Sequence, residues 1–162
     1  MKFRPFKPED AVICFRLRSN AFIRKFYGEL TAEDVAAAVN AYMPDDYIRM
    51  ARECPIFIVE KDGVPVDFFN LKRKDRRTAE LPLIYINLDC LGAGIGTDCV
   101  DYMVKWLQEN WPEVDALIVD TVIPKYNSKF YKKAGFVPGE STHCNFLGHK
   151  LKALRLTKKL GN

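Results

Sequence analysis

A strand, a glycine-bearing loop and a helix follow one another between Leu83 and Leu107, and this succession constrains the fold more than any other stretch of the chain. An apolar segment ends at Leu88, and the loop Leu91–Gly96 contains three glycines. Apolar residues then recur at positions 100, 103, 104 and 107, the spacing of one buried helix face. Thr97 stands where an N-cap is expected. Such a unit presents free backbone N–H groups and the positive end of a helix, so it suits a phosphate.

The other segments predict one α/β (α+β) domain over residues 1–162, a length that suits a single core. Thr31 and Asp34 begin a helix in the manner of a capping box, and Asp62-Gly63 indicates a hairpin turn. We expect strands at 2–6, 56–59, 64–71, 78–88 and 116–122, helices at 8–28, 31–41, 45–53, 97–110 and 128–134, and extended segments at 136–138, 142–147 and 151–160.

Composition narrows the class of protein. No apolar run is long enough to span a membrane, and the N-terminus lacks the apolar region of a signal peptide, so we expect a cytoplasmic protein without membrane contacts. The formal net charge of +4 favours an anionic ligand but is too small to indicate nucleic-acid binding. The 5 cysteines are scattered without a CxxC pair, which fits reduced thiols better than disulfides or a zinc site, so we expect no metal.

The glycine loop matches neither common nucleotide-binding motif. It has Thr97 where GxGxxG would need its third glycine, and it lacks the lysine of a Walker loop. A second motif, Asn127–Phe136, combines Asn, Tyr, Gly and Phe on a short helix and its C-terminal end. The two motifs and the order of elements around them resemble the GNAT superfamily of N-acetyltransferases, whose loop follows the pattern [Q/R]-x-x-G-x-[G/A]. The resemblance implies a central, mostly antiparallel twisted sheet of about seven strands with helices on both faces.

The resemblance further implies direct transfer of an acetyl group from acetyl-CoA, as cosubstrate, to a primary amine of an unidentified acceptor. The acceptor would be a small molecule or a peptide, and the protein a monomer or a homodimer. The cofactor-binding residues carried over are Ile86, Leu88, Leu91, Gly92, Ala93, Gly94, Ile95, Gly96, Thr97, Asn127 and Tyr131. Asn127 has the alternative role of a simple N-cap.

The family's chemistry needs a proton donor for the leaving thiolate, a base for the amine and a donor for the oxyanion. Tyr131 matches the family tyrosine that serves as general acid, with a packed aromatic as the alternative. Glu80 is preferred over Asp89 as the base, and either could equally be a surface acid. The resemblance places the oxyanion donor among main-chain N–H groups at Ile86–Leu88.

Two positions depart from the family pattern. Leu91 replaces the usual Arg or Gln at the first loop position, which removes one polar contact worth about 1–3 kcal/mol. Asp67 stands where many relatives carry a small Gly, and we interpret it as a solvent-facing strand position. Leu91 also favours one alternative function, a catalytically inactive acyl-CoA-binding or regulatory domain. A nucleotide-binding domain of another α/β type is a further alternative, against which the missing glycine and lysine argue.

The first predicted helix carries two sets of residues that bear on the acceptor. We interpret its basic residues as a solvated face; they are Arg16, Arg18, Arg24 and Lys25. Aromatic residues on and beyond this helix suggest an enclosed acceptor site but serve equally as core; they are Phe22, Phe26, Tyr27 and Tyr42.

Overall fold

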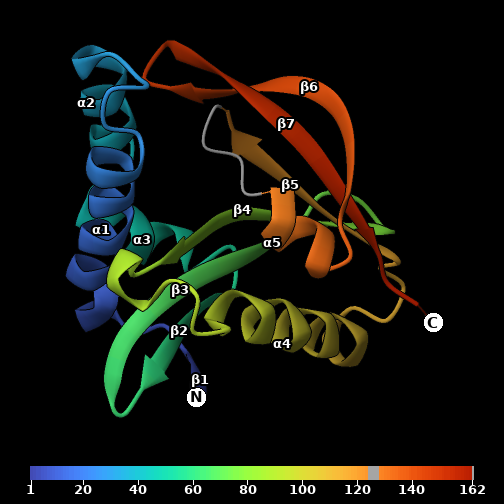
Figure 1. Ribbon diagram of the computed structural model, residues 1–162. Coiled ribbons are helices and arrows are strands. Elements are labelled where there is room, and N and C mark those ends of the chain that lie inside the picture. The colour runs from blue at the N-terminus through green and yellow to red at the C-terminus, as the bar shows by residue number, and fades with distance from the viewer. Residues whose placement is uncertain (124–127, 162) are drawn as a thin grey trace.

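Seven strands form one sheet in the spatial order β1-β2-β3-β4-β5-β7-β6, and only the β4–β5 pair is parallel (Figure 1). The computed structural model describes residues 1–123 and 128–161. The strands are β1 (Lys2–Pro5), β2 (Ile56–Lys61), β3 (Val64–Arg73), β4 (Thr78–Ile86), β5 (Ala116–Val122), β6 (Val137–Phe146) and β7 (His149–Lys159). The predicted mostly antiparallel sheet of about seven strands is confirmed.

Helices cover both faces of this sheet, with α1, α2 and α3 on one side and α4 along the other (Figure 1). The helices are η1 (Pro8–Asp10), α1 (Ala11–Asn20), the π-helical turn η2 (Ala21–Lys25), α2 (Ala32–Asn40), α3 (Pro44–Met50), η3 (Leu88–Cys90), α4 (Ile95–Asn110) and α5 (Ser128–Lys133). No described helix is both long and apolar enough to cross a membrane.

The predicted apolar face of α4 is buried against the sheet. Val100, Met103 and Leu107 lie in one core with Phe57 and Leu71 of β2 and β3. On the opposite face, the core formed with α1 and α3 contains Cys14, Leu17, Tyr47, Ile58, Phe68 and Leu83. Because successive strand residues point to opposite faces, the two cores share the same strands.

A bulge in β4 changes the direction of the strand. Leu81 packs in the α4 core and Leu83 in the α1 core, although residues two apart on a regular strand share a face. The pairing with β3 shifts by one residue here, and the Asn70 side chain bridges the shift by accepting a hydrogen bond from the Leu83 amide at 2.9 Å. Beyond the bulge, β4 diverges from β5, since the two pair only at Thr78–Glu80. Bulges of this kind often re-aim strands beside binding sites.

Several predicted local signals are confirmed, and the boundaries of α4 and β4 are among those corrected. The Thr31 hydroxyl accepts from the Asp34 amide at 3.1 Å and caps α2 as predicted. The prediction of Thr97 as N-cap is wrong, because α4 begins at Ile95 with Gly94 at the cap, in the left-handed region at φ 81°. Glycine adopts that conformation without steric cost, so the helix begins earlier than the side-chain signal indicates. β4 ends at Ile86 rather than at residue 88.

Arg4 joins the first strand to the first helical turn. Its guanidinium donates to both oxygens of Asp10, at 2.7 and 2.8 Å, and to Glu60 at 2.6 Å. Asp10 is only 5% exposed. Replacing Arg4 by Met would leave this carboxylate buried without its charged partner, so we expect the free energy of unfolding to fall by about 2 kcal/mol in urea titrations.

The control is Arg49→Met, because Arg49 forms an exposed ion pair with Asp46 within α3. Exposed pairs contribute about 0–1 kcal/mol, so this variant should unfold close to the parent. Equal losses in the two variants would contradict a special role for Arg4.

Candidate active site

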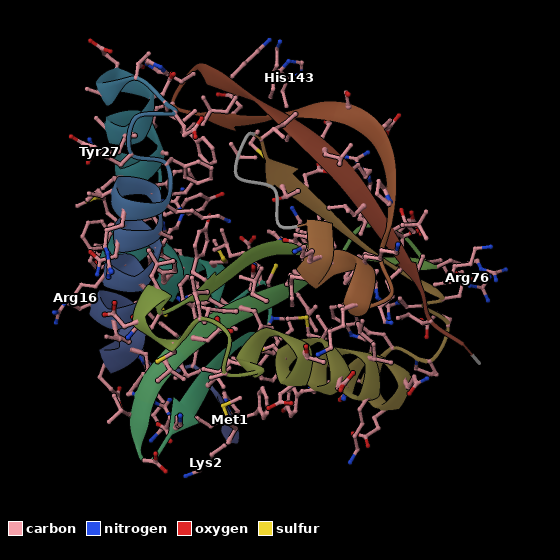
Figure 2. All side chains as sticks on the ribbon, in the orientation of Figure 1. Met1, Lys2, Arg16, Tyr27, Arg76 and His143 are labelled. Carbon is pink, nitrogen blue, oxygen red and sulfur yellow. The ribbon has the colours of Figure 1, made fainter. Side chains whose placement is uncertain are left out.

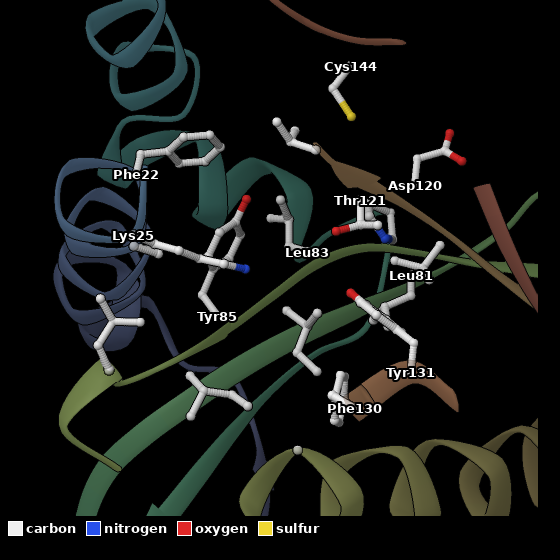
Figure 3. A pocket seen from close by; sticks show the side chains of 18 of the residues that line it. Phe22, Lys25, Leu81, Leu83, Tyr85, Asp120, Thr121, Phe130, Tyr131 and Cys144 are labelled. Atoms are coloured by element: carbon white, nitrogen blue, oxygen red, sulfur yellow. The ribbon is translucent and has the colours of Figure 1, made fainter. Parts of the chain in front are cut away.

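A cleft of about 890 Å³ opens where β4 and β5 diverge, a volume typical of ligand sites (Figure 3). Its walls come from β4 and β5, from the glycine loop and the first turn of α4, and from α5, η2 and β6. Figure 3 shows Tyr131, Asp120 and Phe22 on different sides of it. The cleft therefore brings together segments from both halves of the sequence.

The glycine loop supplies unused backbone donors at one end of the cleft. The N–H groups of Gly92, Gly94, Ile95 and Gly96 make no hydrogen bond to any described residue. Gly92 and Gly94 both have positive φ, at 84° and 81°, so this backbone path favours glycine. Ile95 and Gly96 are the first two residues of the 16-residue helix α4, where N–H groups have no carbonyl partner within the helix. Together these donors can hold a phosphate group.

Most of the predicted cofactor-binding residues line this cleft. The lining includes Ile86, Leu88, Leu91, Gly92, Gly94, Ile95, Gly96, Thr97 and Tyr131. Ala93 lies on the exposed loop but does not line the cleft, and Asn127 lies outside the described residues. The cleft also contains Arg24, Lys25 and Lys133, cations that favour an anionic ligand.

The edge of β4 adds further main-chain donors. Leu83 and Asn87 direct their N–H groups toward β3, to the Asn70 side chain and to the Val66 carbonyl. Because N–H directions alternate along a strand, the amide of Ile86 points to the opposite edge, where β5 has moved away. Within the predicted oxyanion interval, the Asn87 amide is therefore occupied and the Ile86 amide faces the cleft.

Tyr131 projects from α5 and is 8% exposed (Figure 3). Its ring packs edge-on against Phe136, with centroids 5.6 Å apart, and against Phe130 at 4.9 Å. Phe130 in turn closes on the helix start, since a Cβ at Gly96 would come within 2.7 Å of its ring. This packing holds the Tyr131 ring at the cleft, so both roles predicted for it, acid and packed aromatic, are compatible with the position.

The two candidate bases differ in position. Glu80 lines the cleft at the point where β4 and β5 part, and no described residue forms an ion pair with it. Asp89 lies outside the lining, exposed beside the loop, and binds Arg24 at 2.9 Å. That ion pair lowers the pKa of the Asp89 carboxyl. The geometry therefore favours Glu80 over Asp89.

The interpretation of Asp67 as solvent-facing is wrong. Asp67 is 0% exposed beneath the first turns of α4, and the Cys99 thiol donates to its Oδ2 at 3.0 Å. Burial raises the pKa of this carboxyl to about 7, against the opposing effect of the Cys99 hydrogen bond. In the sequence, Asp67 alternates with the apolar residues Val66 and Phe68, a pattern that predicts an exposed side chain. The pattern does not reveal the burial of Asp67, because the helix that covers it, α4, is distant in the sequence.

The solvated-face interpretation also fails for one basic residue of the first helix. Arg16 points outward (Figure 2), but Arg18 is fully buried beside the cleft. Among the predicted acceptor aromatics, Phe22, Phe26 and Tyr42 line the cleft, whereas Tyr27 is 86% exposed. Sequence reasoning missed Arg18; the aromatic residues that cluster around it were the available signal.

Comparisons with known proteins agree with this architecture. The model of the acetyltransferase (GNAT) family matches residues 20–136. No curated protein sequence matches.

No cluster of three or more potential metal ligands occurs in the described part of the chain.

Solved structures share the fold at low sequence identity. A GCN5-related N-acetyltransferase from Rhodopseudomonas palustris superposes with a TM-score of 0.83 at 22% identity, covering 98% of this chain and 95% of that one. The PaiA N-acetyltransferase from Thermoplasma acidophilum, solved with coenzyme A, superposes at 0.80 with 16% identity and 98% coverage of both chains. Because the family model covers well over half of the sequence, the chain belongs to the GNAT acetyltransferase family.

Proposed function

We propose that the protein is an N-acetyltransferase that transfers an acetyl group from acetyl-CoA to a primary amine by direct attack. The observation that carries the proposal is the shared cleft, which joins the N–H groups of Gly92, Gly94, Ile95 and Gly96, unpaired among the described residues, to Tyr131 and the open edge of β4. A family relative of the same fold was solved with coenzyme A. The donor set fits a pyrophosphate, because backbone N–H groups and a helix N-terminus bind phosphate oxygens.

In the proposed reaction, different residues of the cleft have different roles. Acetyl-CoA supplies an activated thioester. The Ile86 amide stabilises the oxyanion at the carbonyl, and Glu80, directly or through water, accepts the proton that the attacking amine loses. Tyr131 donates a proton to the sulfur of the departing CoA. Because Tyr131 is buried, few water molecules can compete with its hydroxyl as proton donor to the sulfur.

Ligand binding provides the first test of this proposal. We expect CoA and acetyl-CoA to raise the melting temperature, while NAD and ATP do so weakly or not at all. Absence of stabilisation by CoA compounds would refute the proposal. Release of CoA across a panel of amines then separates an enzyme from the alternative, an inactive acyl-CoA-binding domain that the leucine at position 91 favours.

Leu91 offers a more specific prediction. It is 62% exposed on the loop and lines the cleft, at the position where family members carry Arg or Gln. Leu91→Arg is expected to lower the Kd for CoA about tenfold, because an added cation beside the pyrophosphate contributes about 1–3 kcal/mol. Isothermal titration calorimetry measures the change.

The matched control is Val64→Arg, which adds the same charge at a residue 60% exposed beside the β2–β3 turn. Its CoA affinity should equal that of the parent. A tenfold gain in CoA affinity in both variants would show that the added net charge alone causes the effect. No gain in CoA affinity in Leu91→Arg would show that the pyrophosphate does not bind beside position 91.

A further inference from the structure

Arg18, on α1, carries a charge that no described acidic residue neutralises. Its side chain is 0% exposed, and its Nη1 donates a hydrogen bond to the Ala38 carbonyl at 2.5 Å. Its Nε and Nη2 atoms are buried and have no aligned hydrogen-bond partner in the described ranges. The nearby Tyr85 hydroxyl interacts with the guanidinium, which opposes the rise in the pKa of Tyr85 that burial causes. Because a guanidinium stays protonated in proteins, two charged donors lie buried without an anionic partner, which is costly unless an anion reaches them.

Four aromatic rings separate this guanidinium from the cleft. The distances from the guanidinium carbon to the ring centroids are 4.7 Å for Tyr42, 5.0 Å for Phe22, 5.5 Å for Phe146 and 5.7 Å for Tyr85. All four residues line the cleft, and Figure 3 shows Phe22 and Tyr85 at the end nearest α1. Ring faces attract the cation but offer no acceptor as strong as a carboxylate. One end of the cleft thus has a positive charge directly behind its wall.

The geometry of Nε and Nη2 of Arg18 indicates which kind of anion they can bind. On the same protein, Arg155 holds the carboxylate of Asp120 through Nε and Nη2, at 2.8 and 2.7 Å. These are the two atoms that Arg18 leaves unused. A planar fork of two parallel N–H groups matches the two oxygens of a carboxylate. Arg18 therefore offers the same fork to a ligand that Arg155 offers to Asp120.

The far end of the cleft has the opposite character. Glu80 lines it without an ion pair to any described residue, although it interacts electrostatically with Arg155, which is paired with Asp120. A ligand with an amine directed toward Glu80 and a carboxylate directed toward Arg18 would match both ends. A polyamine, positive along its length, would be repelled by Arg18.

We propose that the acceptor is an amino-acid-like molecule whose carboxylate is bound by Nε and Nη2 of Arg18, after one of the four rings turns aside. This inference rests on the proposed acetyltransferase function and adds the class of acceptor to it. Arg18 acts as a specificity-determining residue and takes no part in the chemical step.

Matched pairs of amines test this on the unaltered protein. Leucine is compared with 3-methylbutylamine, phenylalanine with 2-phenylethylamine, and 5-aminopentanoate with butylamine, because each amine is its partner without the carboxylate. Spermidine is added as a polyamine. We expect kcat/KM for at least one carboxylate compound to exceed that of its partner about 100-fold, since a buried unpaired donor discriminates strongly against a ligand that leaves it unpaired.

Variants at position 18 locate the effect. Arg18→Met should raise the KM of the preferred carboxylate compound about 100-fold and leave that of its partner within about threefold, and Arg18→Lys should recover part of the loss. Arg16→Met, the same change on the exposed side of the same helix, should behave like the parent. Stabilisation by CoA should be equal in all four proteins, which shows that the fold and the cofactor end are intact.

The outcomes separate the two proposals. Equal rates within every pair, turnover of spermidine alone, or turnover of none of the panel despite stabilisation by CoA would overturn the carboxylate inference and leave the CoA site standing. An equal loss for both members of a pair in Arg18→Met would reduce Arg18 to a structural role. If the Arg18 variants fail to fold, the comparison within pairs on the parent protein still decides the question. Absence of stabilisation by CoA would instead refute the proposed function.

Discussion

Replacing Tyr131 by phenylalanine is expected to lower kcat by about 10²–10³ and to leave the Kd for CoA within about twofold. The change removes one hydroxyl and keeps the ring that packs against Phe130 and Phe136. Without that hydroxyl, the sulfur of CoA would leave as an unprotonated thiolate, so the barrier of the chemical step rises while ground-state binding is preserved. Detection of released thiol with the best amine of the panel measures kcat, and calorimetry measures the affinity for CoA.

Tyr27→Phe is the control, because Tyr27 is 86% exposed and points away from the cleft (Figure 2). It should retain full turnover. Undiminished turnover in Tyr131→Phe would show that Tyr131 is a packed aromatic and that the proton comes from another group. A loss of both turnover and CoA binding would indicate instead that the hydroxyl supports the cofactor site.

Replacing Asp67 by asparagine is expected to stabilise the protein above pH 7. The folded chain holds this carboxyl at a pKa of about 7, whereas an unfolded Asp titrates near its ordinary value of about 4. As the pH rises from about 4 to 7, the unfolded state releases the proton first, so the free energy of unfolding falls. The full loss is about 4 kcal/mol, and the Asp67→Asn variant would not incur it, because a carboxamide stays neutral.

The measurement is the difference in unfolding free energy between Asp67→Asn and the parent, from urea titrations at pH 5, 6, 7 and 8. The difference should grow in favour of the variant up to about pH 7 and then level off. Asp101→Asn, which removes an exposed acid from the same helix that covers Asp67, is measured alongside as the control for the loss of a surface acid. A difference for Asp67→Asn that does not change with pH would mean that the buried carboxyl titrates at an ordinary pKa in the folded chain.

The position of Asp67 also bears on the proposed cofactor end of the cleft. Its partner Cys99 lies near the start of α4, close to the glycine loop, and the thiol's hydrogen bond ties β3 to that helix. Desolvation raises the pKa of Cys99, so the thiol keeps its proton and can remain the donor. The thiol therefore remains the donor to Asp67 whether or not that carboxyl is ionised.

Local signals predict most of the secondary structure correctly. The cap at Thr31, the turn at Asp62-Gly63 and the apolar spacing along α4 each depend on residues within a few positions of one another. Propensity and backbone sterics act over that range, so the sequence alone suffices. The predicted start of α4 is wrong because Gly94, which has no side chain to cap the helix, ends the loop before Thr97.

The sequence by itself determined the order of the elements, the glycine loop and the family motifs, and through them the cofactor end of the proposed site. Only the tertiary structure decided which polar residues are buried. Arg18 and Asp67 look like exposed charges in their local context, yet rings from η2, β4 and β6 surround the first and α4 covers the second. Burial depends on segments distant in the chain that meet after folding, and the free energy of a buried charge depends on those neighbours. The proposed acceptor end of the cleft is therefore a property of the fold.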